Sequence, residues 1–143
     1  MNLIGDSFLV YSDGSCWTGD RIGGWAWVAI DEDDNFQTGG GSEEDTTISR
    51  MELMGAIGAL ENLLTYCGPS VVLVYSDSQY VVLGATDRSR ARNKNNDLWE
   101  RLDTIIDSHT LVELEHVRGH SGDDFNELAD DLAGEFRKGR QNG

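Results

Sequence analysis

Two aspartates end identical tetrapeptides in this chain, and they are the first candidates for chemistry. Val10 to Asp13 and Val74 to Asp77 both read Val-Tyr-Ser-Asp, and each closes an apolar run typical of a buried strand. A helical segment between the two runs predicts a crossover connection. We therefore expect the two strands to be parallel neighbours, with both carboxylates at the edge where open α/β sheets bind ligands. Either Asp taken alone would also fit a turn or a helix cap.

Two further carboxylates lie on predicted helices and are placed to join this pair. Glu52 stands at the border of the apolar stripe of its helix, although Ser49 to Glu52 also fits the S-x-x-E capping box. In the last helix, Asp130 follows Asn126 by four residues on one flank of an apolar stripe made by Leu128, Leu132 and Phe136. That flank is expected to face the sheet.

Four converging carboxylates predict a metal-dependent reaction. Without cations they would repel one another, and some of their pKa values would rise. Oxygen ligands without clustered Cys or His suit Mg²⁺, with Mn²⁺ as a substitute. Two such ions about 3.5 to 4 Å apart would activate a water and stabilise the attacking and leaving oxygens of a phosphoryl centre. The chemistry indicated by these residues is phosphodiester hydrolysis.

The hydrophobic pattern predicts the elements that must hold these side chains. Strands are expected over residues 7–13, 23–32, about 36–41, 70–77 and 110–116, and helices over 49–65, 78–85, 97–108 and 126–138. The run at 70–77 is apolar throughout, which predicts a strand covered on both faces. The predicted fold is α/β: a three-stranded antiparallel meander plus two parallel strands in one mixed sheet, flanked by helices. A single domain over residues 1–143 is expected.

The composition limits the class of protein and raises a question about its charge. The chain has 26 acidic and 11 basic residues, a net charge of −15 that by itself argues against a polyanionic partner. Cys16 and Cys67 are far apart and form no CxxC motif, so neither a disulfide framework nor a zinc site is indicated. No segment resembles a secretion signal or a membrane span, which favours a cytoplasmic protein without membrane contacts.

Five ordered segments resemble type 1 ribonuclease H, a family of endonucleases that cut the RNA strand of RNA/DNA hybrids. They read YSDGSC at 11–16, RMELMGAIGALENL at 50–63, YSDSQYV at 75–81, NDLWERLD at 96–103, and VRGHSG at 117–122 followed by NELAD at 126–130. The segments follow one another with family-like spacing over nearly the whole chain. The resemblance implies the ribonuclease H fold and Mg²⁺-dependent cleavage of hybrids.

The same resemblance implies a role for each matching residue. Asp13 would bridge two Mg²⁺ ions, Asp130 would complete the site of the ion that activates water, and Glu52 and Asp77 would hold the other ion. His120 would help to protonate or release the product. The substrate contacts implied by the resemblance are Ser15, Cys16 and Gln79 in the minor groove, where RNA 2′-hydroxyls are read, and Thr47 and Asn95 at a phosphate of the DNA strand.

The chain departs from the family pattern at three places that concern the substrate. Gly19, Ile48 and Ser49 stand where family members often carry Asn-type residues. The basic protrusion of longer members is reduced here to residues 88–94, which hold four of the 11 basic residues. We interpret this segment as a shortened hybrid-binding loop, with a solvated surface loop as the alternative.

Three hypotheses for the function follow. The leading one is a monomeric ribonuclease acting on RNA/DNA hybrids; the others are a structure-selective DNA nuclease of the same fold and an inactive module that only binds hybrids. Abundant Asp with few Lys also suggests adaptation to high salt, where a Debye length of about 3 Å at 1 M removes long-range repulsion from a nucleic acid.

Overall fold

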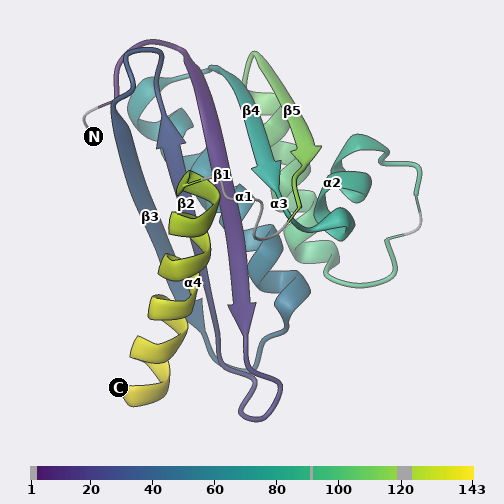
Figure 1. The fold of residues 1–143 in the computed structure, drawn as a ribbon. Helices are drawn as coiled ribbons and strands as arrows, with labels where there is room; N and C mark the ends of the chain where they lie inside the picture. Colours follow the sequence, from purple (N-terminus) through teal and green to yellow (C-terminus); the bar gives the residue numbers. More distant parts are fainter. Residues whose placement is uncertain (1–2, 91, 119–123) are drawn as a thin grey trace.

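A five-stranded mixed sheet separates two layers of helices in the computed structural model, which describes residues 3–90, 92–118 and 124–143 (Figure 1). The elements in chain order are β1 Ser7–Cys16, β2 Gly23–Ile30, β3 Phe36–Glu43, α1 Ile48–Cys67, β4 Val71–Ser76, α2 Gln79–Thr86, α3 Asn96–Ser108, β5 Leu111–His116 and α4 Asp124–Asn142. The sheet order is β3-β2-β1-β4-β5, antiparallel across β3, β2 and β1 and parallel across β1, β4 and β5. The predicted fold class and strand directions are confirmed.

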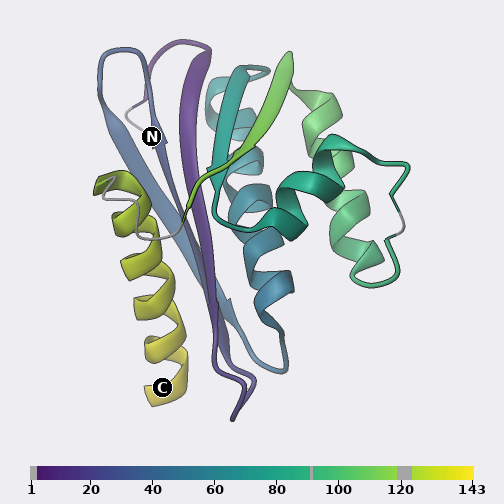
Figure 2. The ribbon, with the colours of Figure 1, turned by 45° about the vertical axis from the view of Figure 1, so that its right-hand side comes forward.

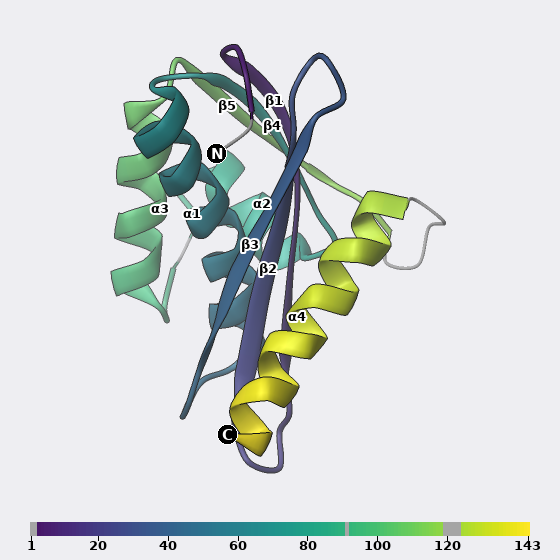
Figure 3. The same cartoon turned by 90° about the vertical axis from the view of Figure 1, so that its left-hand side faces the viewer.

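The helices cover the two faces of the sheet in different ways. On one face α1 packs against β1 and β2, with α3 behind it, whereas α4 alone crosses β1, β2 and β3 on the other face (Figures 2 and 3). The main core lies between α1 and the sheet, where Leu53, Ile57 and Leu60 are fully buried. None of the helices in the described ranges is long and apolar enough to cross a bilayer.

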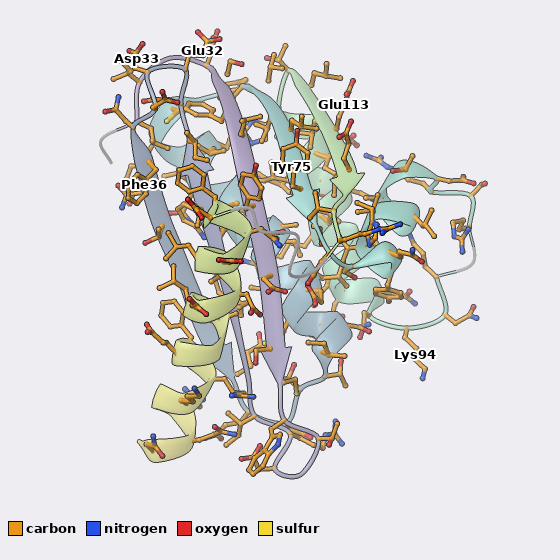
Figure 4. The ribbon with its side chains drawn as sticks, viewed as in Figure 1. Glu32, Asp33, Phe36, Tyr75, Lys94 and Glu113 are labelled. Carbon is orange, nitrogen blue, oxygen red and sulfur yellow. The ribbon has the colours of Figure 1, made fainter. Side chains whose placement is uncertain are left out.

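Strand β4 is fully covered on one face only, so the prediction of a strand buried on both faces was wrong. Val72 and Val74 are buried against α1, but Val71 on the opposite face is 41% exposed. The reason is the position of α4, which lies over β1 to β3 and leaves this side of β4 only partly covered, with Tyr75 half-buried against Tyr11. Figure 4 shows Tyr75, on β4, on this side of the sheet.

Helix α1 begins two residues earlier than the capping-box pattern predicts. Thr47 is the residue that caps it, because its side chain accepts a hydrogen bond from the Arg50 backbone N–H at 3.3 Å. Ser49 lies inside the first turn, so the capping-box interpretation of Glu52 was wrong. The Glu52 side chain is therefore available for another role.

Helix α4 packs mainly through small residues. Of the four residues expected to face inward, Leu128, Leu132, Ala133 and Phe136, only Ala133 is buried. Its buried residues are Asn126, Ala129 and Ala133, whereas Phe136 is 36% exposed. Small side chains on this face let the helix approach the sheet closely, and the backbone of α4 at Ala133 and Arg137 lies directly over Gly24 of β2. The helix also extends to Asn142, beyond the predicted end at residue 138.

The segment between α2 and α3 is fastened to the protein by two of its arginines. Arg92 forms a bidentate ion pair with Asp103 (2.6 and 3.1 Å), donates to the Gly84 carbonyl at 2.7 Å, and places its guanidinium 4.4 Å from the centroid of the Trp99 ring. Arg88 pairs with Asp107 at 2.8 Å and with Asp103 at 3.3 Å. Half of the cations in the predicted hybrid-binding loop therefore neutralise carboxylates of α3.

Replacing Arg92 with Ala is expected to destabilise the protein by about 2 kcal/mol, the scale of a charge-assisted hydrogen bond lost from a half-buried site. Arg88 would still contact Asp103, so the loss of stability should be smaller than for a buried carboxylate left without any ion-pair partner. Urea unfolding measures the change, and the exposed Arg90→Ala variant in the same loop serves as the control, with a shift below about 0.5 kcal/mol. Equal stability of the two variants would show that Arg92 does not fasten the loop.

Candidate active site

A glycine contact between β1 and α1 brings the first two carboxylates together. A Cβ atom on Gly14 would lie 2.5 Å from the backbone nitrogen of Glu52 and 2.6 Å from the carbonyl carbon of Met51, so only glycine fits at this point. Asp13 directly precedes Gly14 and is buried. The close approach therefore fixes Asp13 beside Glu52.

The parallel pairing of β1 and β4 positions the third carboxylate, Asp77. Ser12 pairs with Ser76, which places Asp13 and Asp77 next to each other where β4 ends, as the repeated tetrapeptide predicts. The expectation that β1 also ends at Asp13 was wrong, because β1 continues to Cys16 by pairing with β2. The turn after Asp77 is held by the Ser76 hydroxyl, which accepts a hydrogen bond from the Ser78 N–H at 3.1 Å. Ser78 in turn caps α2.

Helix α4 supplies the fourth carboxylate, Asp130. Near the start of α4, the Phe125 ring lies 6.0 Å from the ring of Tyr11 on β1 and 5.9 Å from the ring of Phe36 on β3, measured between centroids. This aromatic cluster positions the helix over the sheet. Asp130 is exposed to solvent, but its side chain is within hydrogen-bonding reach of Asp13. Its charge also acts on Glu52 and Asp77.

The four side chains make a site whose electrostatics favour a cation. Burial raises the pKa of Asp13 to about 9, with further contributions from the charges of Glu52 and Asp77. Burial likewise raises the pKa of Glu52 to about 8 and the pKa of Asp77 above its ordinary value. These carboxyl groups are therefore costly to ionise unless positive charge is supplied.

The donor set fits a hard divalent ion. One oxygen each from Asp13, Glu52 and Asp77 lies within 4.8 Å of the others. Oxygen Oε2 of Glu52 and Oδ1 of Asp77 are buried without a hydrogen-bond partner among the described residues. Buried carboxylate oxygens without partners are costly, and an oxygen-only site of this size suits Mg²⁺ or Mn²⁺.

The predicted minor-groove residues lie around this carboxylate cluster. Ser15 and Cys16 are the half-buried last residues of β1, and Gln79 is the exposed first residue of α2. Burial raises the pKa of the Cys16 thiol, which is therefore neutral at pH 7. His120 lies outside the described residues.

Thr47 and Asn95, the predicted phosphate contacts, stand on either side of Arg50. The Arg50 backbone N–H donates to the Thr47 hydroxyl, while its guanidinium donates to Asn95 Oδ1 at 3.4 Å and to both carboxylate oxygens of Asp97 at 3.0 and 2.8 Å. This ion pair lowers the pKa of Asp97 to about 2. Asn95 adopts a left-handed backbone conformation (φ 62°), and its amide donates to Tyr80 Oη at 3.1 Å.

Arg50 is a residue of the site that the sequence did not assign. Arg50 precedes Glu52 by two residues, so the sequence shows that the two are close. The ion-pair partner of Arg50 is Asp97, which is 47 residues further along the chain. No local pattern connects the two. The ion pair joins the start of α1 to the start of α3 and holds Asn95 between them.

Beside Asn95 lies a cavity of about 310 Å³ that presents several cations on an otherwise acidic protein. Its lining includes Ser49, Tyr80, Arg90, Arg92, Lys94 and Asn95. Lys94 extends into solvent from the loop between α2 and α3 (Figure 4). Because Arg92 is already paired with Asp103, Arg90 and Lys94 are the exposed cations of this cavity that remain for an anionic ligand.

Comparisons with known proteins agree with this arrangement. The family model for RNase H matches residues 5–138 of the chain. Ribonuclease H of Alcanivorax borkumensis is 39% identical over 137 residues, which cover 87% of this chain and 87% of that relative. Among solved structures, RNase H1 from the halophilic archaeon Halobacterium salinarum NRC-1 has a TM-score of 0.79 at 24% identity and covers 93% of this chain and 98% of that one. LC11-RNase H1 in complex with an RNA/DNA hybrid has a TM-score of 0.82 at 19% identity, covering 94% and 99%.

Proposed function

Because the chain belongs to the ribonuclease H family, we propose that it hydrolyses the RNA strand of RNA/DNA hybrids at the site formed by its four carboxylates, with two Mg²⁺ ions. The observation that carries the proposal is the convergence of oxygens from Asp13, Glu52 and Asp77 within 4.8 Å, in a cluster where one buried oxygen each of Glu52 and Asp77 has no hydrogen-bond partner among the described residues. A protein that only binds hybrids would have no use for such mutually repelling groups. One of the similar solved structures, LC11-RNase H1, is a complex with an RNA/DNA hybrid.

Each carboxylate has a distinct part in this proposal. Asp13, at the centre of the cluster and in reach of Glu52, Asp77 and Asp130, would touch both ions. Glu52 and Asp77 would hold one ion, and the exposed Asp130 would complete the site of the other, open to water. When bound, the ions would supply charge stabilisation at the phosphate and activate the attacking water. His120 would help to release or protonate the product.

The chain's own residues would orient the hybrid around this site. Ser15, Cys16 and Gln79 would face the minor groove, where the 2′-hydroxyls distinguish RNA from DNA. Asn95, held between Arg50 and Tyr80, would meet a phosphate of the DNA strand together with Thr47. Arg90 and Lys94 would add charge attraction at the neighbouring cavity.

The proposal also covers the domain organisation of the enzyme, its oligomeric state, its cell compartment and the salt concentration at which it works. We propose that residues 1–143 act as one domain, that the protein works as a monomer in the cytoplasm, and that it is adapted to high salt. The net charge of −15 supports the last point, because at high ionic strength the repulsion between an acidic protein and a nucleic acid is screened. A DNA nuclease of the same fold is the alternative to be excluded.

Cleavage of a defined RNA/DNA hybrid tests the proposal. We expect hydrolysis of the RNA strand only with Mg²⁺ or Mn²⁺, no cutting of double-stranded DNA or RNA of the same sequence, and activity that persists above 1 M salt. Labelled strands resolved on a denaturing gel give the answer. Equal cutting of DNA would exclude the ribonuclease assignment, and activity confined to low salt would exclude the salt adaptation.

A further inference from the structure

An exposed tryptophan stands at the end of the strand that carries Asp13. Trp17 is 60% exposed, and Ile48, the first residue of α1, is 48% exposed. Both line a pocket of about 290 Å³, together with Cys16, Thr18, Arg21, Thr46 and Thr47, and this lining presents mostly carbon. Single exposed apolar residues are common on proteins, but two that share a pocket beside an active site are unusual.

The backbone holds Trp17 in place. Its N–H donates to the Ile22 carbonyl at 3.0 Å, and its carbonyl accepts from the Arg21 N–H at 2.9 Å. The Arg21 carbonyl accepts from the Thr46 N–H at 2.9 Å, which ties the β1–β2 loop to the segment before α1. The position of Trp17 relative to α1 is therefore fixed before any ligand binds.

The pocket is continuous with the proposed substrate path. Trp17 follows Asp13 by four residues, which span at most about 13 Å of extended chain, or no more than about four steps of a duplex at 3.4 Å per step. Ile48 precedes Glu52 by about one turn of α1, a rise of about 6 Å. Two of the proposed substrate contacts, Cys16 and Thr47, are part of the lining. Arg21 and Arg137 lie near enough to Cys16 to oppose electrostatically the effect of burial on the pKa of its thiol.

Charge attraction alone is a weak source of affinity for this protein. Its net charge is −15, and two of the four cations in the loop at 88–94 are paired with Asp103 and Asp107. High salt would screen the remaining attraction along with the repulsion. Contact between apolar surfaces does not weaken in this way, and some salts strengthen it.

We propose that Trp17 and Ile48 form an apolar contact for the hybrid, packing against sugars in the minor groove within about four duplex steps of the cleavage site. This inference rests on the proposed function and adds a source of affinity that does not depend on ionic strength. Contact with the carbon atoms of the sugars does not depend on the base sequence, which suits an enzyme that must act on many hybrids.

Steady-state cleavage of one hybrid by Trp17→Ala, at about 0.1 M and about 2 M KCl, tests the contact. We expect KM to rise about tenfold at both salt concentrations, which corresponds to the burial of about 55 Å² of apolar surface at about 25 cal/mol per Å², while kcat stays within about twofold. Trp17→Phe should recover most of the loss. Lys94→Ala gives the contrast, because its effect on KM should fade at the higher salt concentration.

The matched control is Tyr66→Ala, which removes another exposed aromatic residue (64%) near the far end of α1, away from the pocket. It should leave KM unchanged. Thermal unfolding of each variant reports whether folding is intact, and Ile48→Ser provides the same test if Trp17→Ala does not fold. A KM for Trp17→Ala within twofold of the wild-type value would overturn the apolar contact alone. A wild-type protein that neither binds nor cleaves hybrids would instead overturn the proposed function.

Discussion

Asp13→Asn should lower kcat for hybrid cleavage by about a thousandfold or more while leaving hybrid binding nearly unchanged. Asp13 is the carboxylate within reach of Glu52, Asp77 and Asp130, so its loss removes the proposed ligand common to both ions. A thousandfold loss corresponds to about 4 kcal/mol of transition-state stabilisation, within the range expected of ion chemistry at a phosphoryl centre. Asn preserves the shape of the side chain, and no proposed contact with the duplex involves Asp13.

Single-turnover cleavage and an equilibrium binding titration separate the two quantities. Asp131→Asn is the matched control, since it removes one negative charge from α4 next to Asp130 at an exposed position. Its kcat should stay within about twofold of the wild-type value. If Asp13→Asn retained wild-type cleavage, the assignment of the metal site would be wrong, and the chemistry would have to be placed elsewhere on the chain.

The sheet was predictable from the sequence because its signals are local or repeated. The apolar runs at 7–13 and 70–77 end in the same four residues, and a single helix between them requires a parallel crossover. The observed pairing of Tyr11 with Tyr75 and of Ser12 with Ser76 follows directly. The apolar residues at 70–77 predict a strand that is buried on both faces. The sequence does not show that α4 covers β1 to β3 and not the neighbouring β4.

The carboxylate cluster was likewise predictable in its members but not in its surroundings. Asp13 and Asp77 follow from the repeated tetrapeptide, although β1 continues beyond Asp13 to Cys16, and Glu52 and Asp130 follow from their places on helices. The close approach that joins Asp13 to Glu52 depends on what a Cβ at Gly14 would meet, which is a tertiary fact. The pairing of Arg50 with Asp97, and of Arg92 with Asp103, joins residues far apart in sequence and has no local signature.

The acidic residues of the chain affect its stability differently at different places. Some carboxylates stabilise the fold by pairing with arginines, as Asp97, Asp103 and Asp107 do. Those at the candidate active site are instead held together against their repulsion by the fold. When metal ions are removed, the cost of holding these carboxyl groups together should therefore lower the stability of the folded protein. The carboxylates that are paired with arginines have no such cost.

This cost at the active site gives the last prediction: without divalent ions, the free energy of unfolding should fall as pH rises from about 5 to about 8. The pKa values of Asp13 and Glu52 are raised in the folded protein to about 9 and about 8, above their ordinary values near 4. In this window the unfolded chain has released these protons and the folded chain has not. Because the folded state binds more protons, stability decreases with pH, by up to about 1.4 kcal/mol per pH unit for each proton.

Urea unfolding in EDTA across this range measures the slope. Asp13→Asn should flatten the slope and raise the stability at pH 8, because this variant no longer carries the Asp13 carboxyl group. The lowered pKa of Asp97 acts only at lower pH, where stability is lost as pH falls towards about 2. Mg²⁺ should stabilise the wild-type protein more at pH 8 than at pH 5, with protons released on binding. A wild-type slope no steeper than that of Asp13→Asn, or Mg²⁺ stabilisation independent of pH, would mean that these carboxyl groups are already ionised in the metal-free fold and that repulsion among them does not oppose folding.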